Sequence, residues 1–148
     1  MGRSFALLSA MLALAALPAN ASTCRLQPKQ VVTRFVTALY VDKKVREAFE
    51  TWADPGYIQH NPLAQSGRDA AIGLLEPFFA QHPDISYSIK RIIADGNLVA
   101  VHSHARFAPD DRGIAVVDIL RVEGCKVVEH WDVVQPVPDK SANPNGMF

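Results

Sequence analysis

The sequence predicts an α+β domain in which three helices pack on one face of a strongly curved, mostly antiparallel β-sheet. Two observations support this prediction. Apolar residues recur at helical spacing in the first half of the chain, whereas residues 85–135 are rich in β-branched side chains and are divided by short turn sequences. Helices and strands that are segregated in this way are typical of α+β domains.

Three helices are predicted between residues 28 and 81. The first, Pro28–Tyr40, opens with a proline, which suits a first helical turn because the missing N–H group would have no partner there. Asp42 is expected to cap a second, shorter helix that Asp54-Pro-Gly56 ends. The third helix runs from about Arg68 to Gln81, and Pro77 should kink or divide it.

Four strands are predicted after the helices. Their connections contain Gly, Asn, Asp and Pro, the residues that favour turns, so consecutive strands should pair as an antiparallel meander. Tyr57–His60 is expected to be a short extended piece that ends at Asn61-Pro62, and the tail from Pro136 to Phe148 is expected to be irregular. The four predicted strands are residues 85–94, 98–107, 113–122 and 126–135.

Residues 1–21 have the pattern of a secretory signal peptide. Arg3 supplies the positive charge, residues 5–17 are apolar or small, and Ala19-Asn-Ala21 fits the cleavage pattern. A membrane anchor is the alternative, but this apolar run is shorter than the roughly 20 residues needed to span a bilayer. We therefore expect cleavage after Ala21, a single mature domain of residues 22–148, an exported (periplasmic or secreted) protein and no membrane association after cleavage.

Composition and cysteine content narrow the classes of partner. Removal of Arg3 leaves fourteen basic against fifteen acidic residues in the mature chain, and no basic run occurs, which argues against a nucleic-acid partner. The two cysteines, Cys24 and Cys125, form an even set, which in an exported protein favours a disulfide. Two free thiols are the alternative. Neither cysteine has a histidine nearby, so a thiol enzyme is not expected.

Polar residues interrupt three neighbouring strands. His130 and Asp132 are two residues apart in the last strand, so their side chains share a face. His102 and His104 share a face of the second strand, and Asp118 interrupts an apolar run in the third. Burial of such groups is costly unless they are hydrogen-bonded, so their joint occurrence predicts a polar pocket inside the sheet.

Other interpretations of these residues have less support from the sequence. Taken singly, a strand histidine is more often solvent-facing, and Asp118 could pair with an arginine. The spacing of His102 and His104 after Gly96 matches a cupin metal site, but the later half of that pattern is absent. No nucleophile elbow, phosphate loop or dinucleotide fingerprint is present. The chemistry that remains among these alternatives is acid–base catalysis by carboxylate and imidazole groups in an apolar pocket.

Several segments together resemble one protein family. Tyr57-Ile-Gln-His-Asn-Pro62, Val117–Gly124 and Lys126–Pro136 resemble the SnoaL-like polyketide cyclases, and Asn143–Phe148 resembles a bacterial branch of the family that is predicted to catalyse aldol condensation. The resemblance extends from about Pro28 to Phe148. It implies the nuclear transport factor 2-like fold, a cone of three helices and a strongly curved sheet that encloses a pocket, and a homodimer formed through the open face of the sheet.

The resemblance also implies a chemistry. In the cyclases an aspartate in the pocket is the acid–base group of an aldol closure that needs no metal or organic cofactor. Its best match here is Asp132, with His130, Asp118 and His60 as polar companions, and the order of the two aspartates stays open. The leading hypothesis is a lyase or isomerase that acts on a small carbonyl compound. The alternative is an exported, non-catalytic module that binds an apolar ligand. The residues expected to contact the substrate are His102, His104, Tyr57 and Trp52.

Overall fold

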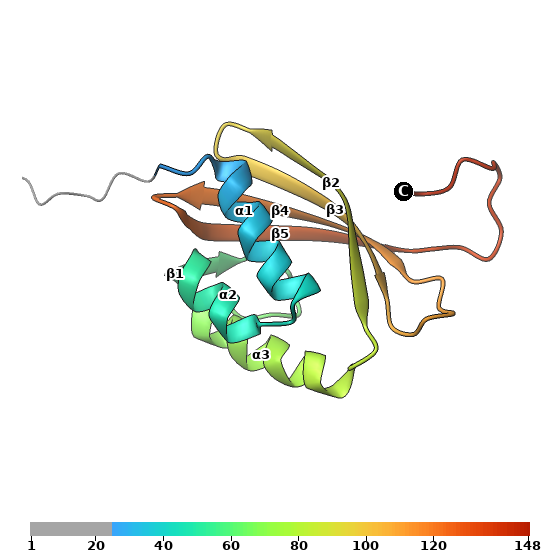
Figure 1. The fold of residues 1–148 in the computed structure, drawn as a ribbon, viewed down its shortest axis with the longest axis horizontal. Helices are drawn as coiled ribbons and strands as arrows, with labels where there is room; N and C mark the ends of the chain where they lie inside the picture. Colours follow the sequence, from blue (N-terminus) through green and yellow to red (C-terminus); the bar gives the residue numbers. More distant parts are fainter. Residues whose placement is uncertain (1–24) are drawn as a thin grey trace, which may run out of the picture.

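The computed structural model describes residues 25–148 (Figure 1). The predicted signal peptide and Cys24 lie outside these residues, so cleavage and the disulfide stay predictions. Within residues 25–148, every helix is too short or too polar to cross a membrane.

Three α-helices and a five-stranded sheet confirm the predicted α+β class. The helices are α1 (Pro28–Val36), α2 (Val45–Trp52) and α3 (Arg68–Gln81), and a π-helical turn, η1 (Thr37–Val41), directly follows α1. The strands are β1 (Ala53–Gln59), β2 (Ser86–Asp95), β3 (Leu98–Arg106), β4 (Ile114–Glu123) and β5 (Lys126–Pro136). The sheet has the open order β1-β5-β4-β3-β2, in which only the β1–β5 pair is parallel.

The largest departure from the predicted elements is β1. The sequence predicts only a short extended piece at Tyr57–His60, but the strand begins at Ala53 and pairs with β5. A parallel pair needs a long crossover connection instead of a local turn, so no turn sequence marks this pairing. The sheet therefore has one more strand than the predicted meander.

Two details of the helices bear on the predictions for Pro77 and Asp42. Helix α3 is continuous through Pro77, so the proline does not divide it. Gly73, whose carbonyl would have bonded to the missing N–H group, is an exposed residue. Asp42 does not cap α2, which begins after Lys44, because its own N–H group still bonds to the Thr37 carbonyl at the end of η1.

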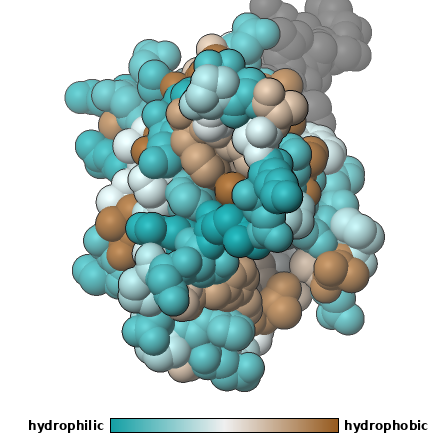
Figure 2. All heavy atoms as spheres, turned by 90° about the vertical axis from the view of Figure 1, so that its right-hand side faces the viewer, coloured by the Kyte–Doolittle hydropathy of each residue, from teal (hydrophilic) through white to brown (hydrophobic). Residues whose placement is uncertain are grey.

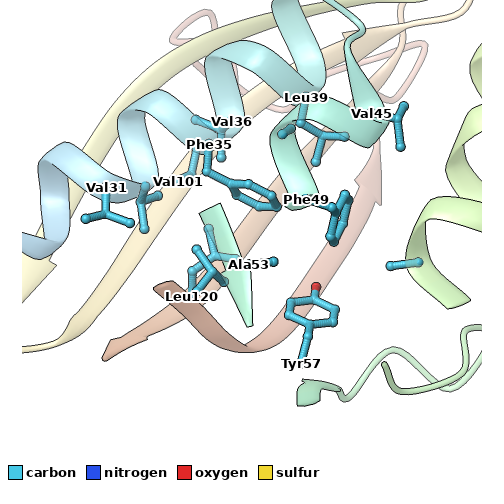
Figure 3. Close-up of a cluster of buried hydrophobic side chains, with 14 of the residues drawn as sticks. Val31, Phe35, Val36, Leu39, Val45, Phe49, Ala53, Tyr57, Val101 and Leu120 are labelled. Carbon is cyan, nitrogen blue, oxygen red and sulfur yellow. The ribbon is translucent and has the colours of Figure 1, made fainter. Parts of the chain in front are cut away.

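The core lies between α1, α2 and the helix-facing side of the sheet. Figure 1 shows α1 crossing in front of β4 and β5, with α2 and α3 at one edge. Phe35 and Phe49 meet edge to face at 5.1 Å, and Phe49 meets Tyr57 in the same way at 5.6 Å (Figure 3). Such aromatic pairs contribute about 0.5–1.5 kcal/mol each beyond the area that they bury. They fix Tyr57 at the border between the core and a cavity.

Strand register brings the two polar strands together. Asp118 of β4 lies directly opposite Val101 of β3 on one side and Asp132 of β5 on the other. Directly paired residues share a face, so both carboxyl groups point towards the helices. Residues 137–148 form no helix or strand, and the last of them, Phe148, returns to stack on His104 at 4.1 Å.

Candidate functional site

A cavity of about 270 Å³ lies between the helices and one part of the sheet. Its volume is close to the lower end of the range of ligand pockets, roughly 300–1,000 Å³. Asp118 and His130 are 2% and 8% exposed and lie deep in it, whereas Leu74 and Val134 are about half exposed and lie at its mouth. Its polar lining residues are Tyr40, Tyr57, Gln59, Asn61, Tyr87, Asp118, His130 and Asp132.

The rest of the lining is apolar, and no lysine or arginine of the described part of the chain belongs to it. Val134 lies near the end of β5 from which the tail leaves. Figure 2 views the molecule from this side, where hydrophobic surface lies between hydrophilic groups. The cavity therefore offers an apolar entrance and a polar floor.

A register shift in β5 turns His130 and Asp132 into this cavity. Arg121 of β4 pairs with Glu129, but the next residue, Val122, pairs with Val127, so Val128 is an extra residue on β5. Such a bulge reverses the alternation of faces. Val127 can therefore fill the core while His130, three residues later, also faces inward.

His130 is held between two oxygen atoms. Its Nε2 lies 2.9 Å from Asp118 Oδ1, and its Nδ1 lies 2.9 Å from Gln59 Oε1. Gln59 Oε1 also accepts a hydrogen bond from the backbone N–H of Asn61 at 2.9 Å, which identifies this atom as the amide oxygen. Nδ1 must then donate its hydrogen to Gln59, and one further proton lies between Nε2 and Asp118.

Asp118 is almost fully enclosed. The Tyr40 hydroxyl donates to its Oδ1 at 3.0 Å, beside the contact with His130. Within residues 25–148, no group donates to its other oxygen, Oδ2, which is buried. An ionised carboxylate with an unpaired buried oxygen is expensive, and the proton shared with His130 reduces that cost. Asp118 therefore belongs to a closed hydrogen-bonded unit.

Asp132 is the more open carboxylate. Asn61 Nδ2 donates to its Oδ2 at 2.7 Å, and the orientation of this amide is fixed because Asn61 Oδ1 accepts from the backbone N–H of Leu63. In the described part of the chain, the Asp132 carboxylate has no other hydrogen bond, and this side chain is only half-buried in the cavity wall. One oxygen is positioned and the other is available to a ligand.

Three tyrosines surround the floor of the cavity. Burial raises the pKa of Tyr40, Tyr57 and Tyr87, and the negative charge of Asp118 raises each further, to about 12 for Tyr87. All three phenols therefore stay protonated at ordinary pH. They can act as hydrogen-bond donors and not as bases.

Four of the predicted site residues line the cavity: Asp118, His130, Asp132 and Tyr57. The expected position of His60 beside them is wrong. Because Gln59 points inward at the end of β1, the next side chain points to the other face, where the His60 ring stacks on Trp131 at 4.7 Å and bonds to Glu129 at 2.8 Å. Trp131, between His130 and Asp132 in β5, therefore also faces away from the cavity.

The predictions that His102, His104 and Trp52 face the cavity are also wrong. In β3 the residues Val101 and Ser103 are buried on the helix side, so the two histidines point to the outer face, against Phe148. Desolvation, followed by nearby Arg91 and Lys90, lowers the pKa of His102. Trp52 packs at the edge of the core.

The guanidinium of Arg34 lies 5.7 Å above the Trp52 ring, so Trp52 has a packing role.

Within residues 25–148, no three His, Cys, Asp or Glu side chains are placed to hold a metal ion. The cupin-like spacing of His102 and His104 therefore brings no third ligand with it.

Four cavity residues were not identified from the sequence: Tyr40, Gln59, Asn61 and Tyr87. Gln59 and Asn61 flank His60, and strand alternation at that point would have indicated them instead of the histidine. Tyr40 lies in the π-helical turn, a feature that is frequent at functional sites and that no simple sequence pattern marks.

The fold is the nuclear transport factor 2-like α+β fold, with a cavity between the helices and the sheet. The profile of the SnoaL-like domain matches residues 32–130, which is most of the domain, and the chain belongs to this family. No curated protein matches the sequence.

Solved structures agree on the fold. IdmH from Streptomyces antibioticus, provisionally assigned as a polyketide cyclase, is 21% identical with a TM-score of 0.59 over 74% of this chain and 92% of its own. TsrD from Streptomyces laurentii is 17% identical, TM-score 0.59, over 76% and 91%. A SnoaL-like protein of Agrobacterium tumefaciens, provisionally an isomerase, is 12% identical, TM-score 0.60, over 72% and 95%.

Proposed function

We propose that this protein is an acid–base catalyst that works without a cofactor and removes a proton next to the carbonyl group of a small substrate, with Asp132 as the base. One observation carries the proposal: Asp132 has one oxygen fixed by Asn61 while the other faces a largely apolar cavity. A carboxylate that is held in place with one oxygen open to a bound substrate can act as a general base. The cyclase and isomerase assignments of structural relatives are consistent with this chemistry.

The proposed step moves a proton and electrons only between the substrate and Asp132. The free oxygen of Asp132 takes the proton, the electrons of the C–H bond form a carbon–carbon double bond, and the carbonyl π electrons move to oxygen. In an isomerase, Asp132 returns the proton to another carbon. In an aldol reaction, the enolate carbon attacks a second carbonyl carbon, and the new alkoxide takes the proton from Asp132.

Asp118 and His130 assist this step but do not remove the proton themselves. Both ring nitrogens of His130 are committed to protein oxygens, and Asp118 is enclosed by Tyr40 and His130. The proton that they share offsets the repulsion expected between the directly opposed carboxylates of Asp118 and Asp132.

Solvent deuterium exchange tests the proposal. A panel of small ketones in heavy water is followed by proton NMR with the wild-type protein and with Asp132→Asn, which keeps the shape and removes the base. Asp84→Asn is the matched control, because Asp84 is exposed and is not one of the residues that line the cavity. We expect catalysed exchange that only Asp132→Asn abolishes. Ketone binding without any exchange would favour the ligand-binding alternative.

We also propose that the chain is exported with cleavage after Ala21 and that the mature protein is a homodimer. Support comes from the signal-like pattern of residues 1–21 and from the exposed apolar side chains Ile93 and Val133. Intact mass of protein recovered from a periplasmic fraction tests cleavage. Light scattering of the purified mature protein tests the dimer, and a monomer at micromolar concentration would contradict it.

A further inference from the structure

Of the three cavity tyrosines, Tyr57 is the one best placed to bind a ligand beside Asp132. Its oxygen accepts a long hydrogen bond from Gln59 Nε2 at 3.5 Å, and its own O–H group has no acceptor among the described residues. The ring is held edge to face by Phe49 (Figure 3). It lies 6.3 Å from the His130 ring and roughly parallel to it. An ordered, buried donor without an acceptor is suited to a ligand oxygen.

The other two tyrosines differ from Tyr57. The Tyr40 hydroxyl is already donated to Asp118. Tyr87 stacks on Tyr40 at 4.4 Å. The charge of Asp118 raises the pKa of Tyr87, whereas the charges of both Asp118 and Asp132 raise the pKa of Tyr57. Only Tyr57 therefore combines an uncommitted donor with proximity to the open carboxylate.

The charge of the cavity limits the ligand further. Asp118 and Asp132 line it, and among residues 25–148 no lysine or arginine does. A carboxylate or phosphate ligand would be desolvated beside two acidic groups without a compensating cation, which is strongly unfavourable. A neutral carbonyl compound carries an acceptor for Tyr57 and brings no such cost.

We propose that the Tyr57 hydroxyl donates a hydrogen bond to the carbonyl oxygen of the substrate, and that the site takes neutral ketones or esters and rejects carboxylates. This inference rests on the proposed function, because it assigns the oxygen of the same substrate whose proton Asp132 removes. As the enolate forms, negative charge grows on the oxygen that Tyr57 contacts. Such a donor contributes more in the transition state than in the ground state.

Binding of acetophenone and of benzoate, similar in size but different in charge, tests the inference. The variants are Tyr57→Phe, which removes one hydroxyl group and keeps the ring, and the control Thr51→Val, which removes one hydroxyl group from an exposed residue outside the cavity lining. For wild type and Thr51→Val we expect acetophenone binding with a carbonyl infrared band at lower frequency than in an apolar solvent. Tyr57→Phe should weaken binding about fivefold and abolish the band shift, and benzoate should not compete.

Exchange kinetics add a second readout. Tyr57→Phe should slow deuterium exchange by roughly 10²-fold, more than it weakens binding. Unchanged binding and band position in Tyr57→Phe, or competition by benzoate, would overturn the inference. The band shift should persist in Asp132→Asn, because that variant retains Tyr57. A Tyr57-dependent shift without any exchange would therefore reject the base and leave the assignment of Tyr57 intact.

Discussion

Gln59 links the two halves of the site, and its replacement by leucine is the most informative single change. Its Oε1 accepts hydrogen bonds from His130 Nδ1 and from the backbone N–H of Asn61, each at 2.9 Å. Leucine fills similar space and leaves both donors without this acceptor. An unsatisfied buried donor costs about 1–3 kcal/mol. His130 is buried but Asn61 is only half-buried, so we expect a loss of about 2–4 kcal/mol in the free energy of unfolding.

Urea denaturation followed by circular dichroism measures this loss, with Gln65→Leu as the control because Gln65 is exposed in the loop after β1. The predicted loss is a large part of the about 5–15 kcal/mol typical of a domain. Nitrogen NMR of the His130 ring should also show loss of the fixed Nδ1–H form in Gln59→Leu. Equal denaturation midpoints for the Gln59 and Gln65 variants, with an unchanged ring spectrum, would refute the hydrogen-bond assignment.

Three further predictions follow from the core, the tyrosines and the cysteines. Phe49→Ala should cost about 3–5 kcal/mol in thermal or urea unfolding, because it removes a fully buried ring and leaves a cavity. The three cavity tyrosines have a raised pKa in the folded state, so above pH 10 the unfolded chain loses protons that the native chain keeps, and stability should fall as pH rises. Ultraviolet titration should show tyrosinate absorbance at pH 11 only after unfolding. Mass spectrometry without reductant should find a Cys24–Cys125 bridge, and its reduction should lower stability by up to about 4.7 kcal/mol.

Local sequence patterns were sufficient for most of the fold. Helix α3 spans the predicted residues 68–81, and the four meander strands lie within one residue of their predicted bounds at each end. Both results depend on short-range signals, namely apolar periodicity and turn residues. The Gly124–Cys125 turn shows why such signals work: both residues have positive φ, as a tight hairpin requires.

Assignment of side chains to a face was less reliable, for a physical reason. Two residues that are two apart share a face, but the sequence does not state which face. In β3 the answer was available, because Val99 and Val101 mark the buried side and so direct His102 outward. In β5 it was not, because the bulge at Val128 reverses the alternation and only the pairing with β4 reveals it.

The strand that local patterns missed supplies most of the unforeseen part of the site. Gln59 pairs with His130 in the parallel β1–β5 register, and the N–H group of the next residue, His60, bonds to the His130 carbonyl at 3.0 Å. This pairing places Tyr57 and Gln59 beside His130 and places Asn61 beside Asp132. The meander alone pairs Asp118 with His130 but supplies no partner that orients Asp132. The hydrogen bonds that orient His130 and Asp132 from β1 therefore join segments 71 residues apart, Gln59 with His130 and Asn61 with Asp132.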